Sequence, residues 1–191
     1  MQDSVEKFYA KDRQQWRNWL KKNHKSKLSV WLVFDKGENR VLSYDDIVEE
    51  ALCFGWVDSK PGKVNDTQSK LYISKRKPKS AWSKANKERV KKLSKNKLLQ
   101  PAGFAAVEVA KKNGAWNQLN KSDNLEIPKE LKNLLSKNKK AKTHYESFPP
   151  SSKKIILEWI YSAKKEETKM KRIEETVTLA AKGIKAHHYR Q

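Results

Sequence analysis

A polar trio that follows an apolar corner is the part of this sequence best placed to do chemistry. Asp58, Ser59 and Lys60 come directly after the Phe54-Gly55-Trp56 segment. A carboxylate can act as a general base, assisted by a neighbouring hydroxyl or amine, when a stiff scaffold presents these groups at an open surface. The same residue types also form ordinary turns. The sequence therefore leaves a reactive site and a plain turn as alternatives at this position.

A second candidate is the basic segment that follows, where cations surround a tryptophan. Residues 70–97 contain twelve Lys or Arg and one acid. Ser83 is positioned to cap a helix, and amide groups at a helix start can bind phosphate or carboxylate together with a guanidinium group. The candidate ligand-binding residues here are Arg76, Trp82, Asn86 and Arg89. A solvated basic face with Trp82 as an anchor in the core would give the same pattern, so both interpretations stay open.

An acidic helix face precedes these segments. Asp45, Asp46, Glu49 and Glu50 fall within six residues, a density that raises the question of metal or acid–base chemistry. No His or further carboxylate has the spacing of a metal ligand. Ser43 and Asp46 have the spacing of a capping box. We therefore expect a capped helix with a solvated acidic face, and neither a catalytic residue nor a metal site.

The cysteine and the C-terminal histidines also have plain structural interpretations. Cys53 is the only cysteine and lies in an apolar run, which predicts a buried, unreactive thiol in a reducing compartment. His187 and His188 are adjacent near the C-terminus, with no third ligand positioned to complete a zinc site. We expect no cofactor.

Apolar periodicity predicts an α+β fold. Residues 1–97 are expected to form a small mixed α/β part with a few-stranded sheet, and residues 98–191 a helical part, within one compact unit. The expected strands are 29–34, 41–42, one that starts at residue 57, and 70–74, with a flexible loop at 61–63. The expected helices are 6–23, 43–53, and further helices that start near residues 83, 101, 128, 151 and 167.

The charge of the chain is its strongest compositional signal. It has 43 basic and 22 acidic residues, which gives a formal net charge of +21. Such a charge favours anionic small molecules or polyanions, including nucleic acid, as partners. Most of the cations are lysines, which form fewer specific forked contacts than arginines. No apolar run approaches the roughly 20 residues of a membrane-spanning helix, and the start lacks the apolar core of a signal peptide. We expect a cytoplasmic protein with no membrane span.

Three blocks of the sequence carry a family resemblance. LSYDDIVEEALCFGWVDS, SKRKPKSAWSKANKERV and SAKKEETKMKRIEETV resemble the bacterial YdeI/OmpD-associated family, also described as bacteriocin-protection proteins. The resemblance extends from about residue 16 to residue 183. It implies a role in tolerance of bacteriocins and other cationic antimicrobial peptides and in envelope stress, with no established reaction. The family motif falls on Ala51, Phe54, Gly55, Trp56, Asp58, Ser59, Arg76, Pro78, Trp82, Ser83, Asn86 and Arg89.

Together these features predict a non-enzymatic, cytosolic stress-tolerance protein that binds an anionic ligand. A chain of this net charge is poorly suited to sequester cationic peptides directly. The predicted ligand-binding residues are Trp56, Asp58, Ser59, Arg76, Trp82, Asn86 and Arg89. Two alternatives stay open. One is a small-molecule enzyme with Asp58 as its base. The other is a sequence-independent nucleic-acid-binding protein, which requires the cations of residues 70–97 to converge on one face.

Overall fold

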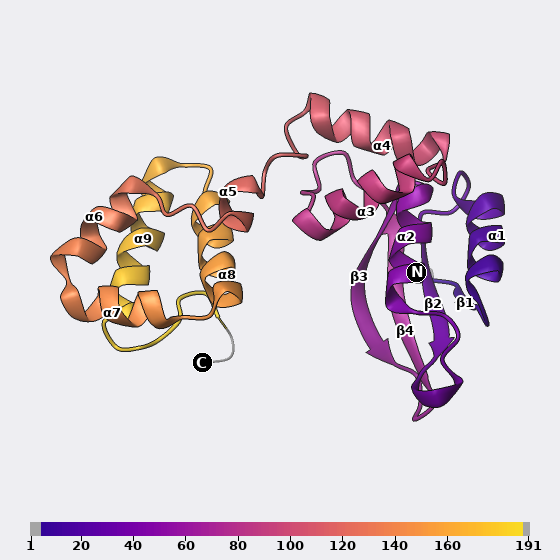
Figure 1. The fold of residues 1–191 in the computed structure, drawn as a ribbon, viewed down its shortest axis with the longest axis horizontal. Helices are drawn as coiled ribbons and strands as arrows, with labels where there is room; N and C mark the ends of the chain where they lie inside the picture. The colour runs from indigo at the N-terminus through magenta and orange to yellow at the C-terminus, as the bar shows by residue number, and fades with distance from the viewer. Residues whose placement is uncertain (1–4, 189–191) are drawn as a thin grey trace. The chain divides into compact units, whose positions relative to one another are not determined.

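Two compact units make up the chain, residues 1–117 and residues 118–191, in a computed structural model that describes residues 5–188 (Figure 1). The elements of the first unit are β1 (Lys7–Tyr9), α1 (Arg13–Asn23), β2 (Ser29–Asp35), a 3₁₀ turn (Gly37–Asn39), α2 (Tyr44–Cys53), β3 (Trp56–Lys63), β4 (Gln68–Lys75), α3 (Lys84–Lys95) and α4 (Pro101–Lys112). Those of the second are α5 (Asn120–Asp123), α6 (Lys129–Lys137), α7 (Lys139–Ser147), α8 (Pro150–Tyr161) and α9 (Glu166–Ala180). The predicted α+β class is confirmed.

The division between the units falls after Asn117, whereas the sequence placed a boundary at residue 97 within one compact body. The physical reason is the position of α4, which packs against α2 and so belongs with the sheet-containing unit. Each unit has a hydrophobic core of its own.

The four strands of the first unit form one mixed sheet in the order β1-β2-β4-β3. β1 runs parallel to β2, and the other neighbouring pairs are antiparallel. The register between β3 and β4 shifts between Asp58 and Pro61, which is typical of a β-bulge.

Three details of the sheet differ from the prediction. Residues 7–9 form a strand and not the first turns of a helix, because their backbone pairs with β2 and Asp12 caps α1 instead. The predicted flexible loop 61–63 lies inside β3, and Pro61 is tolerated there because β3 is an edge strand. Residues 41–42 form no strand in the described chain.

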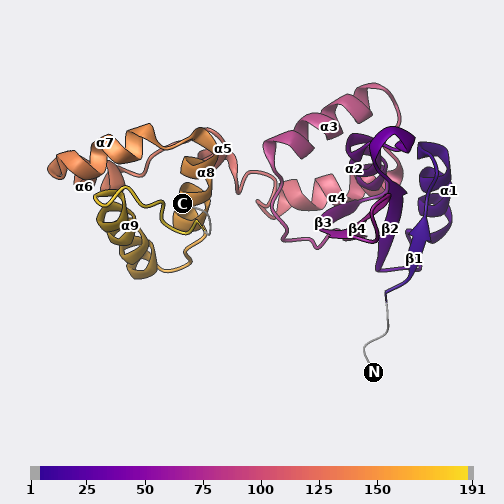
Figure 2. The ribbon, with the colours of Figure 1, turned by 90° about the horizontal axis from the view of Figure 1, so that it is seen from below.

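The sheet is packed on one face only. Val30, Leu32 and Ile73 point toward the helices and have no exposed surface. In Figure 2 the strands lie along the lower side of this unit, with α2 and α3 above them. The alternating positions, such as Trp31 and Tyr72, point to the opposite face and are half-buried. This period-two pattern is what one covered face of a sheet produces.

The helical unit buries a separate core. Leu131, Tyr145, Ile156, Ile160 and Ile173 are at most 1% exposed and come from four different helices. Within this unit α8 and α9 contact each other. Among residues 5–188, no helix is long and apolar enough to cross a membrane.

Candidate anion-binding site

A cavity of about 610 Å³ lies in the sheet-containing unit, where the ends of several elements meet. It is formed by the end of α1, the turn between α2 and β3, the segment after β4, and the first turns of α4. Its lining residues are Lys21, His24, Lys25, Phe54, Gly55, Lys75, Arg76, Lys77, Pro78, Trp82, Gln100, Pro101, Ala102, Ala105, Ala106 and Val109. A volume of this size suits a small organic molecule.

Two glycines allow the walls of the cavity to approach one another. Gly55 has a φ of +73°, a conformation that ends α2 sharply and that other residues rarely adopt. A Cβ at Gly103 would lie 2.5 Å from the carbonyl oxygen of Cys53, so only glycine fits where α4 crosses the end of α2. The Gln100 amide also donates to the Cys53 carbonyl over 3.1 Å. These backbone contacts fix the first turn of α4 as one wall.

The polar part of the lining is cationic. Lys21, Lys25, Lys75, Arg76 and Lys77 supply five basic groups, and none of the described lining residues is acidic. α4 adds the positive end of its dipole, and its cap residue Gln100 makes no side-chain hydrogen bond to the first amide groups. An anion would therefore be stabilised here, and a cation would be repelled.

Arg76 is the most unusual of these cations. Its guanidinium carbon lies 3.8 Å from the centroid of the Trp82 ring, a cation–π contact. Nη1 makes only long hydrogen bonds, to Ser80 Oγ at 3.4 Å and to the Ala81 carbonyl at 3.5 Å. Nε is buried and has no hydrogen-bond partner among the described residues. Burial lowers the pKa of Arg76 to about 10, against the opposing effect of the Asp58 charge.

The rest of the lining is apolar. α4 presents the small side chains of Ala102, Ala105, Ala106 and Val109 to the cavity. Phe54, Pro78 and Pro101 complete this surface, with the ring of His24 5.1 Å from that of Phe54. The arrangement can hold a molecule that has both an anionic group and an apolar body.

Of the seven predicted ligand-binding residues, the structure brings Arg76 and Trp82 together in the cavity. Trp56 has no exposed surface, and its Nε1 donates to the His24 carbonyl over 3.4 Å. It therefore supports the cavity from the core and offers no stacking face. Ser59 Oγ donates to the Tyr72 carbonyl of the neighbouring strand.

The remaining predicted residues lie outside the cavity lining. Asp58 Oδ2 accepts a hydrogen bond of 2.7 Å from the Tyr44 hydroxyl. Burial, followed by this hydrogen bond, raises the pKa of Tyr44 to about 12. Arg89 donates to Asn86 Oδ1 over 3.0 Å and forms an ion pair with Asp45. These contacts connect α2 with β3 and α3 and occupy the polar groups concerned.

Sequence reasoning missed two lysines near the end of α1. Lys21 lies in the last turn of α1 and Lys25 in the turn that follows the helix, and both line the cavity. No local sequence pattern indicates this role, because only the fold shows that the end of α1 lies beside the turn at Gly55.

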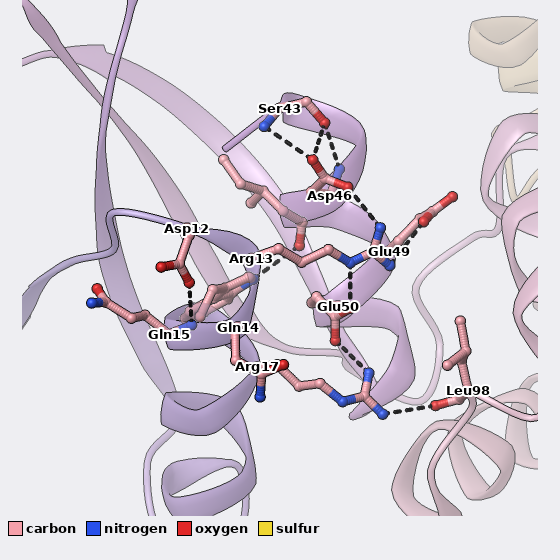
Figure 3. A network of polar contacts seen from close by, with 12 residues as sticks. Asp12, Arg13, Gln14, Gln15, Arg17, Ser43, Asp46, Glu49, Glu50 and Leu98 are labelled. Carbon is pink, nitrogen blue, oxygen red and sulfur yellow. Dashed lines mark hydrogen bonds and ion pairs between the residues drawn. The ribbon is translucent and has the colours of Figure 1, made fainter. Parts of the chain in front are cut away.

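The expected solvated acidic face is wrong for two of its four residues. Glu49 and Glu50 are 5% and 2% exposed. Arg13 of α1 reaches across to Asp46, Glu49 and Glu50 at 2.6, 3.0 and 2.7 Å, as Figure 3 shows. The sequence does not indicate this contact, because the cationic partner of these acids lies in a different helix.

Two further cations complete this cluster. Arg17 binds Glu50 at 2.6 Å, and Lys92 of α3 binds Glu49 at 2.8 Å. A second cavity, of about 490 Å³, lies beside it. Because all four oxygens of Glu49 and Glu50 already have cationic partners, we interpret this region as a structural connection between α1, α2 and α3. Among the described residues, no group of three or more His, Cys, Asp or Glu is placed to hold a metal ion.

Comparisons with known families divide the chain in the same way as its structure. Residues 8–106, about half of the 191 residues, match the model described as "Domain of unknown function (DUF8412)". The chain belongs to the DUF8412 family. Every cavity-lining residue except Val109 falls inside the DUF8412 region. The cavity is thus a feature of this domain of unknown function.

A second family model matches the helical unit. Residues 124–183 match "Bacteriocin-protection, YdeI or OmpD-Associated". This confirms the predicted resemblance for that region, while the N-terminal sequence blocks lie in the DUF8412 region. No curated protein and no solved structure matches the chain.

Proposed function

We propose that the DUF8412 region binds an organic anion with an apolar portion in the cavity beside Arg76. The match of residues 124–183 supports a bacteriocin-protection-type role in general. In this proposal, ligand binding by the first unit serves that role. The ligand is an anion and not a cationic peptide, because five basic groups and no described acid line the cavity.

The state of Arg76 carries the proposal. A buried charge without a hydrogen-bonded partner is costly, so buried guanidinium groups normally have a carboxylate beside them. Arg13 in the same unit follows this rule with three carboxylates. Arg76 has long contacts to Ser80 and Ala81 and an unpartnered Nε, and it is held in place by Trp82. An anionic ligand would supply the missing partner.

Asp58 offers less support for an enzyme. It does not line the cavity, and its Oδ2 already accepts from Tyr44. The described lining contains no carboxylate that could act as a base on a molecule bound beside Arg76. Asp58 is therefore not placed to act as a base on such a molecule.

Binding of anilinonaphthalene sulfonate, an apolar anion whose fluorescence rises on binding, tests the proposal. We expect the folded wild-type protein to bind it saturably. We expect Arg76→Met to bind it at least about tenfold more weakly, because a charge-assisted hydrogen bond is worth about 1.5–3 kcal/mol.

Arg89→Met is the matched control, since it removes the same charge outside the cavity and should keep wild-type affinity. Circular dichroism would verify that both variants are folded. Equal affinity in Arg76→Met and the wild type would refute the proposal, as would an equal loss in both variants.

A further inference from the structure

We propose that the helix-free face of the β-sheet is a binding surface for single-stranded nucleic acid. This inference is independent of the cavity and uses different residues. It rests on three observations: a group of aromatic side chains on adjacent strands, cations beside them, and polar residues at both ends.

The register of β1, β2 and β4 places the aromatic residues next to one another. Trp31 of β2 lies opposite Lys7 of β1 and opposite Tyr72 of β4. In the next row, Tyr9 of β1 lies opposite Val33 of β2. Residues opposite one another in a sheet point to the same face. Three aromatic side chains from three neighbouring strands thus share one face of the sheet. In Figure 2, α2 and α3 lie on the other side of the strands.

These aromatic side chains keep exposed surface. Tyr9 is 38% exposed, and Trp31 and Tyr72 are half-buried. The ring centroids of Trp31 and Tyr72 are 5.1 Å apart with an interplanar angle of 74°, so the two rings face different directions. Exposed tryptophan and tyrosine rings on a sheet are a general platform on which unpaired bases stack.

Charge on this face suits a phosphate backbone. Lys70 Nζ lies 4.6 Å from the centroid of the Trp31 ring, and Lys7 is in the same row as Trp31. Among the described strand residues that point to this face, Asp35 is the one acid, and its oxygens accept hydrogen bonds from Tyr9 and Gln68. Two lysines beside stacking rings give the combination of cation and aromatic ring that single strands require.

The composition of the surface favours a nucleic acid over a protein partner. Ser29 and Ser74 lie opposite one another at one end, and Gln68 lies at the other. Lysine and serine are depleted in protein interfaces, whereas here Lys70 lies beside the central Trp31 ring and two serines lie in the next row. A duplex keeps its bases stacked inside and would use only the lysines. An unpaired strand can use both the rings and the lysines.

Fluorescence anisotropy with a short labelled oligo-dT, over a series of salt concentrations, tests the proposal. We expect the Trp31→Ala/Tyr72→Ala variant to lose at least about fivefold in affinity, because base stacking on an aromatic ring contributes about 1–3 kcal/mol per base. The slope of log K against log salt should stay the same, since no phosphate contact is removed. Lys70→Gln should instead make this slope smaller by about 0.7.

Three controls separate stacking from other effects. Tyr72→Phe keeps the ring and should bind like the wild type. Phe104→Ala removes a 46% exposed aromatic residue of α4 and should also bind like the wild type. Arg76→Met should leave oligo-dT binding unchanged, which distinguishes this surface from the cavity. Wild-type affinity in the double variant, or binding that is equally strong for a duplex of the same length, would overturn the proposal.

Discussion

Two arginines of the sheet-containing unit differ in whether their charge has carboxylate partners. Arg13 binds three carboxylates of α2, and these hydrogen bonds and charges raise its pKa despite partial burial. Arg76 lacks such a partner, and burial lowers its pKa. A base whose pKa is lowered by folding costs folding free energy while it is charged, which at neutral pH it is. Arg13 is therefore a structural residue, and Arg76 is a residue that an anion would stabilise.

Replacement of Arg13 tests the structural half of this contrast. Arg13→Met should lower the free energy of unfolding by about 3 kcal/mol, because it leaves Glu49 and Glu50 buried with fewer partners. We place it at the low end of the range for buried pairs because the Arg13 side chain is 37% exposed. Urea unfolding monitored by tryptophan fluorescence measures the change.

Arg17→Met is the comparison. Arg17 binds only one of these acids, Glu50, so its replacement should lower the free energy of unfolding by less. If Arg13→Met lowers the free energy of unfolding by less than about 1 kcal/mol, the ion pairs of Arg13 contribute no more than exposed surface pairs do.

At the residue scale, the sequence predicted single side chains better than their partners. The sequence predicts Arg76 and Trp82 as separate ligand-binding residues, but not the cation–π contact between them. The carboxylates of α2 were assigned to solvent, since their partner Arg13 is more than thirty residues away in sequence. Partner choice across helices depends on the packing of α1 on α2, which local sequence does not contain.

At the scale of elements, the crossing of α2 and α4 forms the wall of the cavity. Gly55 and Gly103 lie on the two sides of this crossing, and a Cβ on either would come within 2.8 Å of a backbone carbonyl of the other segment. Backbone atoms cannot move aside as a flexible side chain can. The close approach of these two helices thus depends on glycine at both positions.

Gly103→Ala should therefore destabilise the protein by more than about 1 kcal/mol, even though alanine is favoured over glycine in a helix by about that amount. It should also weaken binding of the organic anion, because α4 must move. Thermal unfolding and probe titration measure the two effects.

Gly114→Ala serves as the control for Gly103→Ala. Gly114 has a φ of +82° but open space around it. Its replacement by alanine therefore costs only the free energy of placing a Cβ-bearing residue at positive φ, and it should leave probe binding intact. A Gly103→Ala protein as stable as the wild type would contradict the close crossing.

The sequence predicted most elements, and its errors have physical causes. Strong apolar runs predict β2 and β4, and helix-capping residues predict where α2, α3 and α4 begin. β1 has only three residues and exists because β2 pairs with it, so its own periodicity carries no signal. Pro61 suggested a loop, because a proline is excluded from central strands but accepted at an edge.

At the scale of the whole molecule, the two units differ in composition and in family. The first holds a sheet, a cavity and the DUF8412 region, and the second is helical and matches the bacteriocin-protection model. Each has its own hydrophobic core. The sequence did not reveal the division after Asn117, because no stretch rich in glycine, serine or proline marks it.

Separate expression of the two units tests this organisation. We expect residues 1–117 to fold cooperatively and to bind the sulfonate probe with the affinity of the full chain, since all cavity-lining residues belong to this unit. Residues 118–191 should fold into helices without binding the probe. Circular dichroism and probe titration measure both. A fragment of residues 1–117 that unfolds, or that folds without binding, would show that the second unit is needed.

The bulge in β3 has a consequence for how these molecules behave in a crowded solution. An outer strand with free amide and carbonyl groups can recruit a strand from a neighbouring molecule and start a fibril. β3 interrupts its register between Asp58 and Pro61, where the proline offers no amide hydrogen, and it carries Lys60 and Lys63. This edge resists strand addition, so the sheet can expose aromatic rings on its open face without polymerising through β3.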